Sequence, residues 1–153
     1  MARKVFFSFH FDNDNWRAGQ VRNIGTIEGE KPLAGNRWED VKSKSETTIK
    51  QWIDENLKDK SCLVVLVGEK TSERKWVKYE IDRAWELNKA VCGIYIDKLE
   101  DVYGKQSKKG NNPLKSYMRV FESDYLSSKY VYDDIKNNIA DLVEKAIEAR
   151  KKY

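Results

Sequence analysis

The amino-acid sequence predicts an α/β fold of the doubly wound kind, in which helices cover both faces of a central parallel sheet. Short apolar runs alternate along the chain with longer stretches whose apolar residues recur at helical spacing. Two of these runs, Cys62–Val67 and Ala90–Ile96, are apolar at almost every position, which is typical of parallel strands buried on both faces. Because crossovers between parallel strands are right-handed, we expect helices on both faces of the sheet.

Length and composition bound the class of protein. A chain of 153 residues has the usual size of one domain, so we expect a single domain over residues 1–153. Hydrophobic residues make up 40% and charged residues 35%, which indicates a small globular domain with a heavily charged surface. The net charge is only +4 and the basic residues form no long block, so charge alone does not indicate a nucleic-acid partner. The sequence has no apolar run of about eighteen residues and no signal-peptide pattern, so we expect a cytoplasmic protein outside the membrane.

The N-terminal part of the chain predicts a strand, a short helix and a long loop. The aromatic and aliphatic run Lys4–Phe11 is expected to form a buried strand. Polar turn formers follow it, and Asp14 or Asn15 is expected to cap the helix. Glycine and proline interrupt residues 25–40, which predicts a long loop with a brief strand around residues 25–28.

The middle of the chain predicts a helix, a strand and a second helix. Ser43 and Glu46 form a capping-box pattern. The apolar residues that follow lie on one helical face: Ile49, Trp52, Ile53 and Leu57. After the buried strand Cys62–Val67, the stretch Ser72–Glu86 predicts the start of an amphipathic helix, around which we expect the rest of the chain to be organised.

The C-terminal part completes the alternation. The buried strand Ala90–Ile96 is followed by a polar loop over residues 98–112. Residues 117–121 are expected to form a short edge strand. The final helix is expected to begin near Asp133, because its acidic start and basic end both suit the helix dipole.

The predicted fold indicates where a site would lie. In such sheets, ligands bind beyond the carboxyl ends of the strands, where the strand order reverses. In a flavodoxin-like order this point lies between the first and third strands, so the loops His10–Asn15 and Gly68–Ser72 are expected to face each other. Trp76 and Glu80 lie one helical turn apart and project from the same side. Glu80 is therefore the candidate carboxylate, if its helix is angled toward this point.

Several kinds of ligand site are excluded by missing motifs. The sequence has neither GxGxxG after a strand nor GxxxxGK[ST], so the usual dinucleotide and P-loop phosphate grips are absent. Asp12 and Asp14 resemble the acidic pair of a phospho-receiver, but Gly68 and Glu69 supply no aspartate at the end of the third strand. A phospho-receiver or small-nucleotide sensor is therefore a weaker alternative.

A metal site and a disulfide are not expected either. Cys62 and Cys92 both lie inside apolar runs, so we expect buried thiols of a reducing cytosol. His10 is the only histidine in the sequence, and a metal would need more ligands.

Three segments carry a resemblance to a known family. They are KVFFSFHFDND, RKWVKYEIDRAWE and AVCGIYIDKLEDVYG, and they resemble the TIR-like domains of the Thoeris antiphage system, the ThsB-like branch of the TIR superfamily. The resemblance runs from about Lys4 to Asn112 and is weakest in the last third of the chain. It implies the flavodoxin-like three-layer sandwich of TIR domains. Trp76 and Glu80 match the superfamily signature Trp-x-x-x-Glu, in which the glutamate is catalytic.

The resemblance implies cleavage of the bond between nicotinamide and ribose in NAD⁺, which is then a substrate and not a cofactor. The leaving group is already cationic, so it needs no general acid, and the oxocarbenium-like transition state suits a lone carboxylate. Attack by water gives ADP-ribose, and attack from within the same nucleotide gives a cyclic isomer. The family favours a cyclic product, which serves as a signal for a separate effector protein. Nothing in the sequence selects between the two products.

The resemblance also suggests supporting roles around Glu80. Phe9 and Phe11 would stack on a nicotinamide or adenine ring, and Ser8 and His10 would bond a ribose or phosphate. Trp38, in the long loop, would form one wall of the site. Trp76 is the remaining substrate-binding candidate.

Simpler structural roles compete with each of these assignments. Trp76 also fits core packing, and His10 fits a bond to nearby backbone. Asp12 and Asp14 fit turns shaped by side-chain bonds to the backbone. For the whole chain, the main alternative to an enzyme is a non-catalytic TIR-like module that acts by self-association or by docking onto a partner.

Overall fold

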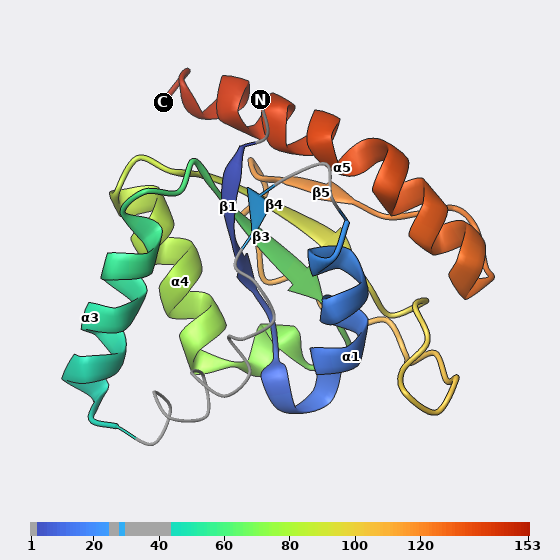
Figure 1. Ribbon diagram of the computed structural model, residues 1–153. Helices are drawn as coiled ribbons and strands as arrows, with labels where there is room; N and C mark the ends of the chain where they lie inside the picture. Colours follow the sequence, from blue (N-terminus) through green and yellow to red (C-terminus); the bar gives the residue numbers. More distant parts are fainter. Residues whose placement is uncertain (1–2, 25–27, 30–43) are drawn as a thin grey trace.

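The computed structural model describes residues 3–24, 28–29 and 44–153, and Figure 1 shows their arrangement. Its centre is a sheet of five parallel strands in the order β2-β1-β3-β4-β5. The strands are β1 (Lys4–Ser8), β2 (Glu28–Gly29), β3 (Cys62–Val67), β4 (Ala90–Tyr95) and β5 (Arg119–Phe121). The predicted flavodoxin-like order is confirmed, and the order reverses between β1 and β3.

Helices cover both faces of this sheet, as Figure 1 shows. They are α1 (Phe11–Arg22), α3 (Glu46–Leu57), α4 (Lys75–Glu86) and α5 (Ser128–Arg150), with the 3₁₀ turn η1 (Thr71–Glu73) before α4. One apolar cluster joins the sheet to α1 and α5, and the other joins it to α3 and α4. The α/β three-layer sandwich expected from the sequence is therefore confirmed.

The central strands are buried because both of their faces are covered. All six residues of β3 are fully buried, and their side chains alternate between the two clusters. In β1 the same alternation sends Val5 and Phe7 toward α1 and α5, and Phe6 toward α3 and α4. Each buried aliphatic or aromatic side chain contributes about 1.5–3 kcal/mol relative to exposure. These strands therefore form the stable centre of the sheet.

The boundary between β1 and α1 differs from the prediction. The strand ends at Ser8, and His10 is the N-cap of α1 with its carbonyl accepting from the Asp14 amide at 2.8 Å. The expected caps at Asp14 and Asn15 are therefore wrong. Phe9 and Phe11 made the strand look longer because aromatic residues have high strand propensity.

The starts of three other helices also differ from the prediction. A serine hydroxyl caps each of two helices: Ser45 accepts from the Thr48 amide before α3, and Ser127 accepts from the Tyr130 amide before α5. The expected start of α5 near Asp133 is therefore too late. The expected cap Ser43 and the first part of the brief strand, residues 25–27, lie outside the described residues. At α4, η1 occupies the stretch before Lys75, so the helix begins later than Ser72.

Candidate active site at the carboxyl edge of the sheet

The end of β1 and the second turn of α4 bring two predicted residues together. The Ser8 hydroxyl donates a hydrogen bond to Glu80 Oε1 at 2.6 Å. Ser8 is 1% exposed and Glu80 is 5% exposed, so both polar groups are buried. They meet beside the point where the strand order reverses, which is the usual ligand position in this class of sheet. The condition that α4 turn Glu80 toward this point is met.

Local periodicity explains why these two side chains meet. By strand alternation, Ser8 follows Phe6 onto the face covered by α3 and α4. On α4, Val77, Ile81 and Ala84 form the buried face, and Glu80 is buried with them. Burying a charged carboxylate is costly unless it is hydrogen-bonded. The Ser8 hydroxyl supplies one such bond.

Trp76 is held by its neighbours in the first turn of α4. Its ring is half-buried against the α3–α4 cluster and makes an edge contact with Tyr79, with ring centroids 5.5 Å apart. The Lys75 ammonium lies 5.1 Å from the centroid of the same ring. These contacts fit the packing role, and its role toward a substrate stays a prediction.

The two phenylalanines after β1 lie differently from Ser8. Phe9 packs against the cluster under α1 and α5, and the Arg22 guanidinium lies 5.5 Å from its ring centroid. Phe11 is the first residue of α1 and lies 6.3 Å from Phe9, between ring centroids. The alternation of β1 therefore turns Phe9 away from the face that holds Glu80, and stacking of either ring on a substrate stays a prediction.

His10 lies at the turn between β1 and α1. Its Nδ1 atom is buried and has no hydrogen-bond partner among the described residues. Burial lowers the pKa of this imidazole, and the positive charges of Arg74 and Lys70 lower it further, while Asp12 and Glu73 act in the opposite direction. His10 thus shares its surroundings with charged side chains from the loop between β3 and α4.

A second buried carboxylate, Asp14, lies at the same edge of the sheet. It is fully buried, and Arg17 Nη1 donates to its Oδ1 at 3.5 Å. A Cβ added to Gly68 would lie within 2.7 Å of Asp14 Oδ1, so the loops after β1 and β3 do face each other as predicted. Desolvation raises the pKa of Asp14 to about 6, although Arg17 acts against this. The turn-forming role expected for Asp14 did not anticipate its burial against a glycine.

Arg17 connects this carboxylate to the loop after β4. Its Nε donates to the Leu99 carbonyl and its Nη2 to the Lys105 carbonyl, both at 2.7 Å. The loop predicted over residues 98–112 is confirmed, and it is anchored by buried contacts.

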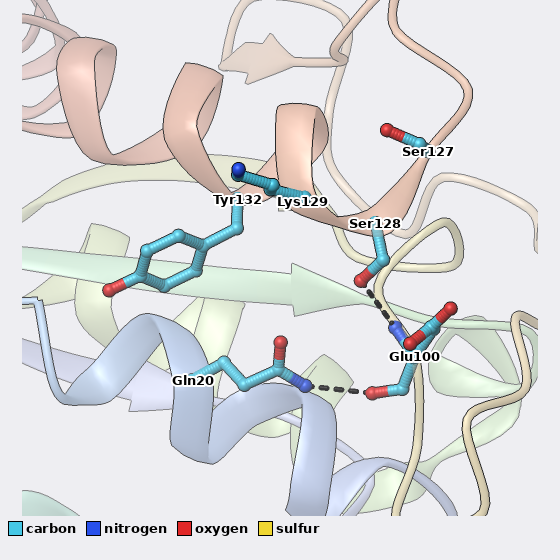
Figure 2. A pocket seen from close by; sticks show the side chains of 6 residues that line it. All are labelled: Gln20, Glu100, Ser127, Ser128, Lys129 and Tyr132. Carbon is cyan, nitrogen blue, oxygen red and sulfur yellow. Dashed lines mark hydrogen bonds between the residues drawn. The ribbon is translucent and has the colours of Figure 1, made fainter.

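A pocket of about 530 Å³ lies farther along this anchored loop, between α1 and the start of α5. Figure 2 shows its lining residues: Gln20, Glu100, Ser127, Ser128, Lys129 and Tyr132. Gln20 donates to the Glu100 carbonyl at 2.7 Å, and the Glu100 amide donates to the Ser128 hydroxyl at 2.9 Å. None of the predicted site residues lines this pocket.

Other predicted features have simpler outcomes. Cys62 and Cys92 are free, buried thiols with their sulfur atoms 3.7 Å apart, as expected. The described residues contain no group of three or more potential metal-ligating His, Cys, Asp or Glu side chains. Among them, too, no helix is both long and apolar enough to cross a membrane. Trp38 lies outside the described residues, so its place in the site stays a prediction.

Comparisons with known proteins agree with the segments that carried the resemblance. A family model described as "Thoeris protein ThsB, TIR-like domain" matches residues 6–101. A relative from Bacillus cereus (strain MSX-D12), "Putative cyclic ADP-D-ribose synthase ThsB1", is 36% identical over 138 residues, which cover 87% of this chain and 67% of the relative. The region matched by the family model includes both Ser8 and Glu80.

Proposed function

The chain belongs to the Thoeris ThsB family of TIR-like proteins, and from this membership we propose that it consumes NAD⁺. Glu80 is the catalytic carboxylate and the bond between nicotinamide and ribose is cleaved. The ADP-ribosyl product closes into a cyclic ADP-ribose isomer. The name of the Bacillus cereus relative, a cyclic ADP-D-ribose synthase, supports this product.

The observation that carries the proposal is the buried hydrogen bond between Ser8 and Glu80 at 2.6 Å. A glutamate in the second turn of a surface helix is ordinarily solvated, whereas Glu80 is 5% exposed and lies at the carboxyl edge of the sheet. A carboxylate held in this way keeps its position during a reaction, because its partner lies on a rigid central strand.

The chemistry fits a single carboxylate. As the nicotinamide bond breaks, the pyridinium ring takes the bonding electrons and leaves as neutral nicotinamide. Positive charge develops on the ribose, and a fixed negative charge nearby stabilises that transition state more than the ground state. Hydrogen bonds from ribose hydroxyls to Glu80 strengthen at the same moment.

The cation that remains is captured by a nucleophilic atom. Attack by an atom of the same nucleotide, with loss of its proton, gives the cyclic isomer, and attack by water gives ADP-ribose. We assign the cyclic product from family membership and the relative's name. In this proposal the product is a signal in antiphage defence, it is made in the cytoplasm and it is read by a separate effector protein.

The test is mass spectrometry of nucleotides in cells that express this protein, with and without phage. Wild-type protein should deplete NAD⁺ and produce a species with the mass of cyclic ADP-ribose, and Glu80→Gln should abolish both. Glu86→Gln is the matched control, because Glu86 lies on the same helix with its side chain 64% exposed. Free ADP-ribose in place of the cyclic species would change the reaction to hydrolysis. Nucleotide pools that never differ between wild type and Glu80→Gln would favour the non-catalytic module.

A further inference from the structure

An arginine at the start of α4 has no role in the Trp-x-x-x-Glu signature. Arg74 is the N-cap residue of α4, and its side chain makes no capping hydrogen bond. Among the charged residues that shift the pKa of His10, Arg74 has the largest effect and lowers it. It follows β3 and η1 in the chain, so it lies at the carboxyl edge of the sheet, where Ser8 meets Glu80.

Arg74 also differs in its contacts from three other arginines. Arg3, Arg17 and Arg83 each form an ion pair with a carboxylate of another element or turn. In the part of the chain that the structure describes, the side chain of Arg74 has no hydrogen bond or ion pair, and neither does the side chain of Lys70 in the same loop. Both side chains are exposed, so their donors are available to a ligand.

The charge of the substrate gives these cations a purpose. NAD⁺ carries a diphosphate with two negative charges, and the proposed catalytic group is itself a carboxylate. Asp12 and Glu73 add further negative charge near His10. A dinucleotide that binds at this edge of the sheet needs cations to offset that repulsion, and a guanidinium matches the geometry of phosphate oxygens.

The spacing along α4 is suitable. Glu80 lies six positions after Arg74, which corresponds to about 9 Å along a helix axis. This is the scale of a ribose and the phosphates attached to it. One ligand can therefore place its diphosphate at the start of the helix and its nicotinamide–ribose bond beside Glu80.

We propose that Arg74, assisted by Lys70, binds the diphosphate of the dinucleotide substrate and so positions the scissile bond at Glu80. This inference rests on the proposed function for the identity of the substrate. It goes beyond that function because it assigns a phosphate subsite to residues outside the signature.

The test is isothermal titration calorimetry with two probes that separate phosphate from the reacting bond. ADP-ribose has the diphosphate but no nicotinamide–ribose bond, and nicotinamide riboside has that bond but no phosphate. All variants are made in Glu80→Gln protein so that no turnover occurs. Arg74→Gln should weaken ADP-ribose binding about 10- to 100-fold, as expected for lost charge-assisted bonds, and leave nicotinamide riboside binding within about twofold.

Two further variants and a fold check complete the design. Lys70→Gln should give a smaller loss for ADP-ribose. Arg119→Gln is the matched control. Arg119 is an exposed arginine on the outermost strand β5, so its replacement should change the binding of neither probe. Circular dichroism establishes that each variant is folded.

The outcomes separate this inference from the proposed function. ADP-ribose binding that is unchanged in Arg74→Gln, absent from the starting protein, or weakened equally for both probes would overturn the phosphate subsite. If wild-type protein does not cleave NAD⁺ but ADP-ribose binding still depends on Arg74, the proposed function fails and the subsite stands.

Discussion

Among the described residues, three buried carboxylates lie at the carboxyl edge of the sheet: Asp97 follows β4, and a helix on each face contributes one of the other two. Asp14 on α1 is fully buried and Glu80 on α4 is 5% exposed. One contact of each carboxylate shows a difference. Asp14 lies against the Arg17 guanidinium, whereas Glu80 accepts a hydrogen bond from a neutral hydroxyl, that of Ser8.

This difference suggests how the two groups are used. The negative charge of Asp14 is already opposed by a cation, and that cation is also bound to two carbonyls of the loop after β4. Through Arg17, this carboxylate is part of the contacts that join α1 to the loop after β4. The Ser8 hydroxyl orients the Glu80 carboxylate without neutralising it. Burial and acidity alone therefore do not identify a catalytic carboxylate.

The largest expected effect on stability comes from Arg17→Met. This change leaves Asp14 buried without its cation and removes both carbonyl contacts, so the free energy of unfolding should fall by about 3–5 kcal/mol. The free energy of unfolding should fall by much less in Glu80→Gln, because the amide oxygen can still accept a hydrogen bond from the Ser8 hydroxyl. Urea denaturation of both variants measures the difference. A loss for Glu80→Gln as large as that for Arg17→Met would remove the distinction between the two carboxylates.

The next effect is a pH dependence that belongs to Asp14. Its pKa is about 6 in the folded protein and near 4 in an unfolded chain, so the folded state binds more protons between these values. The free energy of unfolding therefore falls as pH rises through this window, by about 3 kcal/mol in total. Asp14→Asn removes the titrating group and with it this fall.

The measurement is denaturant unfolding of wild type and Asp14→Asn from pH 4 to pH 7. The stability of the variant relative to wild type should increase across the window. His10, whose pKa is lowered by burial, is common to both proteins, so its contribution cancels in the difference. A relative stability that stays flat with pH would show that Asp14 is ionised throughout.

A smaller effect is expected at Ser8. Removing the hydroxyl in Ser8→Ala leaves Glu80 without this charge-assisted bond, so kcat for NAD⁺ should fall about tenfold with KM little changed. Ser8→Cys keeps a weak donor, so its kcat should lie between that of wild type and that of Ser8→Ala. Steady-state kinetics separates the possibilities. A raised KM with unchanged kcat would instead assign Ser8 to substrate binding, as the resemblance first suggested.

The sequence predicted the fold because its signals were long and consistent. The apolar run Cys62–Val67 is buried at every position, and the helical face of α4 contains the residues that periodicity selects. Boundaries were harder to predict. A histidine N-cap is uncommon, and Phe9 and Phe11 extend the strand pattern into α1, so His10 gave no signal as a cap.

The candidate site was predicted only where a local pattern marked it. The spacing of Trp76 and Glu80 is visible in one helix, whereas the Ser8 contact joins residues far apart in the sequence and needs the fold. Asp14 could not be recognised as buried, because its burial depends on Gly68, a residue in another loop whose missing Cβ makes room for the carboxylate.

The central claim is that Glu80 does chemistry and Asp14 does not. Its most direct test compares nucleotides in phage-infected cells that express wild type, Glu80→Gln or Asp14→Asn at matched protein abundance. We expect no cyclic ADP-ribose product with Glu80→Gln, a fall of at least about 1,000-fold as for loss of a main catalytic group, and product within a few-fold of wild type with Asp14→Asn. Product retained by Glu80→Gln, or lost from folded Asp14→Asn, would contradict the account.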